Sequence, residues 1–183
     1  MLTEPELATV LFHARTGGTY GTLVELLLLT GQRRGEVAAL DTSWIDYEAR
    51  TITIPSAVAK NRREHLIPYG ERVAAILEHL PKNGLVLPGK GTNVPFSGFS
   101  KAMIAFREAS GVEDFTLHDL RRTYSTGLAK LGVAPQTIEA LLNHVTGTLS
   151  PIARIYNRHS YLPEARAALV LWEGHLAKLS TPN

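Results

Sequence analysis

The stretch Thr116-Leu117-His118-Asp119-Leu120-Arg121-Arg122-Thr123-Tyr124 predicts a helix that presents anion-binding groups on one face. Thr116 is a suitable N-cap, because its hydroxyl can accept a hydrogen bond from a free backbone N–H of the first turn. His118 and Arg121 are three positions apart, so a helix places both on one face, where both can contact one phosphate group. A simpler interpretation is a helix start at which Arg122 pairs with Asp119 one turn earlier.

A second candidate anion-binding segment lies upstream, at residues 30–36 (TGQRRGE). Gly31 can adopt the left-handed conformation that ends a helix. Arg33 then lies at the start of the next helix, where free N–H groups and the helix dipole already favour an anion. The alternative interpretation is a solvated arginine pair that Glu36 balances.

Lys60 lies between two predicted strands. Residues 51–54 (TITI) alternate as a strand does, and residues 65–68 (HLIP) predict a second strand, so the pair indicates a hairpin with a basic connection. Desolvation can lower the pKa of an ammonium group enough for it to act as a general acid. One alternative is a soluble charged turn, and another is that Arg62 or Arg63 only binds a phosphodiester backbone.

His144 and Tyr156 complete a set of chemically useful groups. His144 follows Asn143, which tolerates the left-handed conformation at a helix end, and Tyr156 comes twelve positions later between Arg154 and Arg158. A phenol can attack phosphorus if a neighbouring group takes its proton. Tyr161 is the competing nucleophile, whereas Tyr124 is more consistent with a packed residue of its own helix.

Six of these residues follow one order along the chain: Arg33, Lys60, His118, Arg121, His144 and Tyr156. With their local sequences they resemble the catalytic domain of the tyrosine recombinases, the phage integrase family, over nearly the whole chain. The resemblance selects Arg33 rather than Arg34, because the first arginine of the family follows Thr-Gly-x. It also implies a site that needs neither a metal nor another cofactor.

The resemblance implies a function: site-specific recombination of DNA through a 3′-phosphotyrosine intermediate. Tyr156 would attack the scissile phosphate, and His118 would handle the phenolic proton. Lys60 would protonate the departing 5′-oxygen. The charge on the non-bridging oxygens would be stabilised by three side chains: Arg33, Arg121 and His144.

The predicted fold class is mainly α with a small antiparallel β-sheet (α+β), similar to a tyrosine recombinase catalytic domain. Thr3 and Glu6 form a capping-box pattern, and the mostly apolar run from Leu23 to Leu29 favours a buried helix. Gly and Pro residues separate the segments. The spacing of apolar residues predicts helices over about 4–14, 19–30, 70–80, 99–109, 117–131, 135–142 and 163–179.

Length and composition are consistent with this fold class but do not indicate it on their own. The 183 residues are 44% hydrophobic, enough for one domain over 1–183, in which 162–183 form a C-terminal helix and tail. The absence of Cys excludes disulfides and thiol catalysis, and fits a reducing cytosol. The resemblance implies a prokaryotic or phage-derived protein of the cytoplasm that is associated with the nucleoid when active. The balance of 19 Lys and Arg against 17 Asp and Glu does not by itself indicate whether the protein binds nucleic acid. We expect the family's N-terminal DNA-binding domain to be absent from this chain.

Expected partners are double-stranded DNA, further copies in a DNA-bound homotetramer, and accessory DNA-bending or directionality proteins, without a membrane. The C-terminal helix carries Leu169, Trp172 and Leu176 on one stripe, which either docks on a neighbouring protomer or folds back on its own domain. Two other functions remain open. One is a non-catalytic DNA-binding module, and the other is a metal-dependent phosphohydrolase with His118, Asp119 and His144 as ligands.

Overall fold

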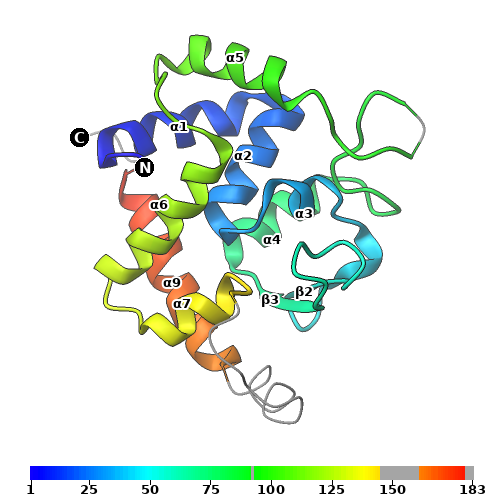
Figure 1. The fold of residues 1–183 in the computed structure, drawn as a ribbon, viewed down its shortest axis with the longest axis vertical. Helices are drawn as coiled ribbons and strands as arrows, with labels where there is room; N and C mark the ends of the chain where they lie inside the picture. The colour runs from blue at the N-terminus through cyan, green and yellow to red at the C-terminus, as the bar shows by residue number, and fades with distance from the viewer. Residues whose placement is uncertain (92, 145–160, 180–183) are drawn as a thin grey trace.

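The computed structural model describes residues 1–91, 93–144 and 161–179 (Figure 1). It confirms the predicted fold class: within these residues, helices surround a small antiparallel sheet. The sheet has the order β1 (Ile45–Asp46), β2 (Thr51–Ile54) and β3 (His65–Pro68), after a short 3-10 turn at Thr42–Trp44. The helices are α1 (Glu4–Thr16), α2 (Gly18–Thr30), α3 (Arg34–Ala38), α4 (Glu71–Glu78), α5 (Phe99–Ser110), α6 (Leu117–Lys130), α7 (Pro135–Leu141) and α9 (Leu162–Leu179).

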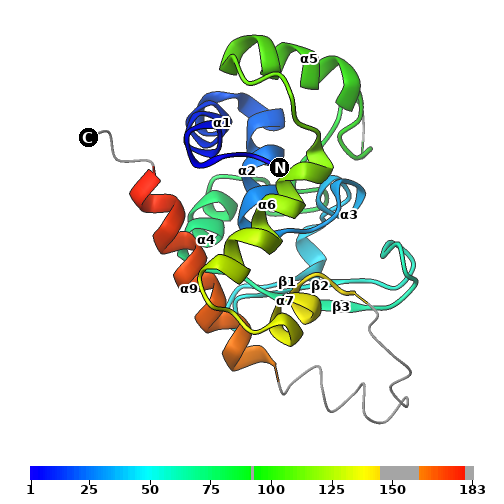
Figure 2. The same cartoon turned by 60° about the vertical axis from the view of Figure 1, so that its left-hand side comes forward.

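Helix α2 forms the centre of the core, with α1, α3, α4 and α6 around it (Figures 1 and 2). Its apolar residues from Leu23 to Leu29 are all buried, as expected for a helix that is hydrophobic on every side. Glu25 interrupts this run and is buried too. Its carboxylate accepts hydrogen bonds from Arg15 of α1 and Arg72 of α4, so the buried charge is paired.

The predicted hairpin strands are confirmed as β2 and β3. They pair antiparallel, with Ile52 opposite Ile67 and Ile54 opposite His65. Strand β1 was not predicted, because two residues are too short to show alternation. Figure 2 shows the connection between β2 and β3 extending beyond the sheet, and this connection carries Lys60.

Helix α9 packs on its own domain, which is one of the two predicted alternatives. Its predicted stripe of Leu169, Trp172 and Leu176 is buried. The indole of Trp172 donates to the carbonyl of Leu28 at 2.8 Å and packs against Gly127, where a Cβ atom would collide with the ring. Within the described part of the chain, no helix combines the length and apolar character needed to cross a membrane.

Candidate active site

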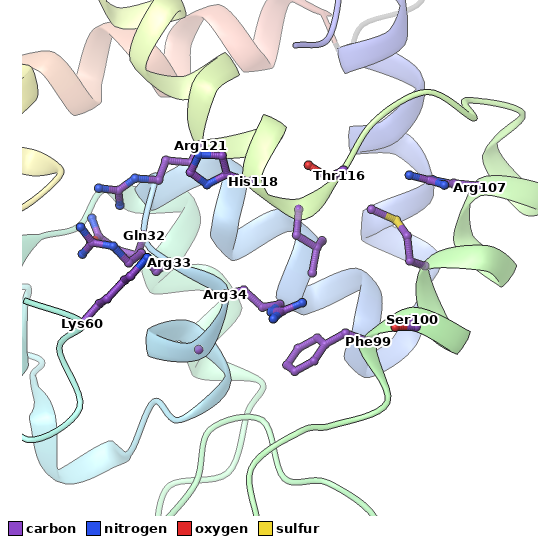
Figure 3. A pocket seen from close by; sticks show the side chains of 13 residues that line it. Gln32, Arg33, Arg34, Lys60, Phe99, Ser100, Arg107, Thr116, His118 and Arg121 are labelled. Atoms are coloured by element: carbon purple, nitrogen blue, oxygen red, sulfur yellow. The ribbon is translucent and has the colours of Figure 1, made fainter.

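A pocket of about 480 Å³ brings together residues from distant parts of the chain (Figure 3). It lies between the start of α3, the connection before β3, α5 and the start of α6. Four predicted catalytic residues line it: Arg33, Lys60, His118 and Arg121. The remaining lining residues that the structure describes are Gln32, Arg34, Gly35, Phe99, Ser100, Met103, Arg107, Thr116 and Leu117.

Arg121 is buried, with 5% of its surface exposed, and the backbone fixes its guanidinium. Nη1 donates to the carbonyl of Gly31 at 2.7 Å, and Nη2 donates to the carbonyl of Leu142 at 2.5 Å. Burial, with a smaller effect of nearby Arg33, lowers the pKa of Arg121 to about 10, so it remains protonated at neutral pH. Carbonyl partners do not neutralise the charge, and the guanidinium can therefore attract an anion in the pocket.

Gly31 supports Arg121 through its backbone conformation. As predicted, it ends α2 in the left-handed region, with φ at 65°. A Cβ atom here would collide with the ring of buried Tyr124. Glycine thus permits both the turn and the close approach that bring its carbonyl to Arg121.

Arg33 precedes α3, as predicted, and is held by the buried carboxylate of Glu36. Oε2 of Glu36 accepts from the backbone N–H of Arg33 at 3.1 Å, and Oε1 accepts from its Nη1 at 3.1 Å. The same Oε1 accepts from the backbone N–H of Lys60 at 3.3 Å. One carboxylate thus joins the first arginine to the lysine-bearing connection, while the side chain of Lys60 lies exposed at the pocket.

The two adjacent arginines have different surroundings. The guanidinium of Arg34 lies over the ring of Phe99, 4.6 Å from its centroid, whereas Arg33 pairs with Glu36 and points toward Lys60 (Figure 3). A cation over an aromatic face is attracted by the ring quadrupole. Arg33 and Arg34 therefore occupy different parts of the pocket, and Arg33 lies on the side of Lys60.

The start of α6 has the predicted cap. Thr116 Oγ1 accepts from the backbone N–H of Asp119 at 3.3 Å, and Oδ2 of Asp119 accepts from the backbone N–H of Thr116 at 3.0 Å. The hydroxyl of Thr116 also donates to Asp119, which lowers the pKa of this carboxyl to about 2. Asp119 further pairs with exposed Arg122 at 3.5 Å, so the simpler prediction for this pair is also met. The cap leaves His118 and Arg121 on the pocket side.

His144 follows α7 after Asn143, which has a left-handed φ of 51° as predicted. Its Nδ1 lies 3.0 Å from Oε2 of Glu139, a partner that sequence reasoning missed. A carboxylate on one ring nitrogen fixes the orientation of the other. His144 does not belong to the described lining of the pocket.

The comparison with protein families agrees with this geometry. Residues 1–162 match the model of the phage integrase family. The chain belongs to this family. Prophage integrase IntZ of Escherichia coli K12 is 33% identical over 154 residues, which are 81% of this chain and 37% of IntZ. The chain thus spans little more than a third of this relative's length.

Two solved structures of integrases have a similar fold. The integrase from mycobacterium phage Brujita gives a TM-score of 0.64 at 20% identity, over 99% of this chain and 58% of that one. The Tn1549 transposon integrase in complex with transposon right end DNA gives 0.59 at 16% identity, over 84% of this chain and 62% of that one.

Three tyrosines were considered as the nucleophile, and the structure describes two of them. Tyr156 lies outside the described residues, so its assignment as nucleophile stays a prediction. Tyr161 directly precedes α9, as expected. Tyr124 is fully buried, and burial raises its pKa, so it is the packed residue that was predicted and cannot reach DNA.

Sequence reasoning also missed Gln32, Asn61 and His65, which surround the end of α7. Gln32 and Asn61 are direct neighbours of predicted catalytic residues, and this adjacency is the one signal in the sequence that points to them. Their contacts cross 76 to 109 positions of the chain, so no local pattern reveals them.

Proposed function

We propose that this chain is the catalytic domain of a site-specific DNA recombinase, part of a longer protein with a separate N-terminal DNA-binding domain. One observation carries the proposal. Arg33 and Arg121, 88 positions apart in the sequence, line one pocket with Lys60 and His118. Each guanidinium is held in place by hydrogen bonds to other groups of the chain. Two fixed guanidiniums suit the non-bridging oxygens of a phosphodiester.

The proposed reaction is a transesterification at a phosphodiester of DNA. The phenolic oxygen of Tyr156 attacks phosphorus and gives up its proton to His118, while Arg33 and Arg121 stabilise the charge on the non-bridging oxygens, with His144 assisting. The bond from phosphorus to the 5′-oxygen breaks, and Lys60 protonates that oxygen. The 3′-phosphotyrosine retains the phosphodiester energy, so a 5′-hydroxyl of another strand can reverse the step and exchange partners.

Double-stranded DNA is the proposed partner, engaged by a homotetramer with accessory DNA-bending or directionality proteins. Arg33, Lys60 and Arg121 give the pocket a cationic lining, and phosphate contacts supply much of the affinity of DNA-binding proteins. The DNA complex of the Tn1549 integrase, which has this fold, also supports the proposal.

The metallohydrolase alternative fits the geometry less well. It requires the carboxylate of Asp119 as a ligand, but this carboxylate caps α6 and accepts three hydrogen bonds from Thr116 and Arg122. A group committed to a helix cap is a poor candidate for coordinating a metal. That alternative also gives no role to the two arginines. Cleavage that survives excess EDTA separates the two reactions.

A covalent-capture experiment tests the proposal. A library of nicked duplexes with a randomised central segment is incubated with the protein, and DNA that stays attached in denaturing detergent is sequenced. We expect an adduct whose peptide maps to Tyr156, and its loss in Tyr156→Phe with DNA binding retained. Tyr161→Phe is the matched control and should keep the adduct. Binding without any adduct would instead indicate a non-catalytic DNA-binding module.

A further inference from the structure

The end of α7 is held by side chains from four other parts of the chain. A helix leaves its last carbonyl groups without partners within the helix, and they must be satisfied elsewhere. Here three consecutive carbonyls, at residues 141, 142 and 143, accept hydrogen bonds from the α2–α3 turn, the β2–β3 connection, β3 and α6. This arrangement fixes the backbone immediately before His144.

Each donor is at hydrogen-bonding distance. Gln32 Nε2 donates to the carbonyl of Leu141 at 2.8 Å, and His65 Nε2 lies 3.0 Å from the same oxygen. Asn61 Nδ2 donates to the carbonyl of Asn143 at 2.9 Å. The carbonyl between these two is the one that binds Arg121. The position of the Arg121 guanidinium therefore depends on α7 as well as on α6, the helix that carries Arg121.

His65 acts here as a neutral donor. Because a carbonyl oxygen can only accept, Nε2 carries the proton. The residue is 6% exposed, and its burial lowers its pKa to about 4, so the ring remains uncharged at neutral pH. His65 therefore does not titrate in the range of the reaction, and its contribution is geometric.

The donors also link the catalytic residues to one another. Gln32 precedes Arg33, Asn61 follows Lys60, and the carbonyl that Asn61 binds precedes His144. Asn143 strengthens the last link, since its Nδ2 donates back to Oδ1 of Asn61 at 3.2 Å. The bonds to the end of α7 thus fix the segments that carry Arg33, Lys60 and His144 relative to one another.

We propose that Gln32, Asn61 and His65 are positioning residues, which hold the end of α7 against the pocket so that Arg33, Lys60, Arg121 and His144 keep one geometry. The proposal rests on the proposed function. It assigns these three residues no contact with DNA. Displacing reacting groups by about 1 Å can slow a reaction about 100-fold, so rigidity at this point matters.

Hydrogen exchange of the free protein tests the structural step. His65→Leu removes the donor and fills the buried position with an apolar side chain, whereas His65→Gln retains an Nε2 donor at a similar distance from the backbone. The amides of Leu142, Asn143 and His144 bond within the helix end, and we expect their exchange to be about tenfold faster in His65→Leu. His65→Gln should restore most of the protection. Unchanged exchange at these amides overturns the proposal without reference to activity.

Covalent cleavage of the captured DNA tests the functional step. At saturating DNA, we expect His65→Leu to form the adduct about 10- to 100-fold more slowly, with DNA affinity almost unchanged and His65→Gln restoring the rate. Asn61→Ala, at a half-exposed position, should slow cleavage in the same way. Val73→Ala in α4, away from the pocket, is the control for lost stability.

Two outcomes contradict the proposal. One is cleavage by His65→Leu and Asn61→Ala at the wild-type rate. The other is a loss that Val73→Ala reproduces at the same melting temperature. If wild-type protein yields no adduct, the proposed function fails instead, and the exchange measurement still decides whether these residues hold α7.

Discussion

The turn that carries Arg33 and the helix that carries Arg121 hold their guanidiniums by different means. Arg33 is partly exposed and pairs with the carboxylate of Glu36, while Arg121 is buried and bound by two backbone carbonyls. An ion pair reduces the charge that a ligand experiences, whereas carbonyls orient a cation without neutralising it. The pocket therefore combines one cation held by a side-chain ion pair with one held by main-chain carbonyls.

The largest expected effect comes from Arg121→Lys. A single ammonium on a flexible stem cannot bind both carbonyls and also present a planar fork to phosphate, so we expect adduct formation to slow at least about 100-fold, with a lower melting temperature. Arg33→Lys is the matched variant, and about tenfold is expected, because only one side-chain ion pair changes. Single-turnover cleavage and thermal melting measure both. The reverse order would show that the exposed arginine is the more important one.

A second prediction concerns the pH dependence of stability at His65, beside Arg121. Its folded pKa of about 4 is below the unfolded value of 6.5, so the unfolded chain binds the extra proton between these values. The free energy of unfolding should therefore fall as pH drops through this window, by up to about 3 kcal/mol. Glu36 opposes this shift in pKa, while Arg121 and Arg33 contribute to it.

Denaturant unfolding at about pH 7 and about pH 4.5 measures this contribution. In His65→Gln the difference between the two conditions should shrink, because glutamine does not titrate. An unchanged difference would mean that other groups cause the acid sensitivity and that His65 is not held neutral.

Local patterns predicted most of the fold and four of the residues that line the pocket. The capping box of Thr3 and Glu6, the apolar run of α2 and the spacing of His118 and Arg121 involve residues within one or two helical turns. The contacts of Gln32 and His65 with the carbonyl of Leu141 depend on tertiary packing, which no periodicity encodes. The hydrogen bond between Glu36 and the backbone N–H of Lys60 also depends on tertiary packing, so the sequence did not predict it.

A third prediction addresses the ion-paired arginine of the comparison. Glu36→Gln keeps the size of the side chain but removes the charge that pairs with Arg33 and accepts from Lys60. Since the amide oxygen carries no charge and the amide NH2 cannot accept from the backbone N–H of Arg33, we expect about tenfold slower adduct formation with a smaller loss of DNA affinity. Glu36→Asp, which keeps the charge, should recover part of the rate. Faster cleavage in Glu36→Gln would mean that the carboxylate mainly weakens the cation.

The smallest effect is expected at Arg122, the direct neighbour of Arg121. Its side chain is 67% exposed and forms only a 3.5 Å ion pair with Asp119 among the residues that the structure describes. Exposed ion pairs contribute little, so Arg122→Ala should change the free energy of unfolding by less than about 0.5 kcal/mol and the rate of adduct formation by less than about twofold. Helix α6 turns these two neighbouring side chains to different faces. We therefore expect cleavage to require the buried guanidinium of Arg121 but not the exposed one of Arg122. Loss of cleavage in Arg122→Ala, with Arg121→Lys still active, would assign the phosphate contact to the exposed face of α6.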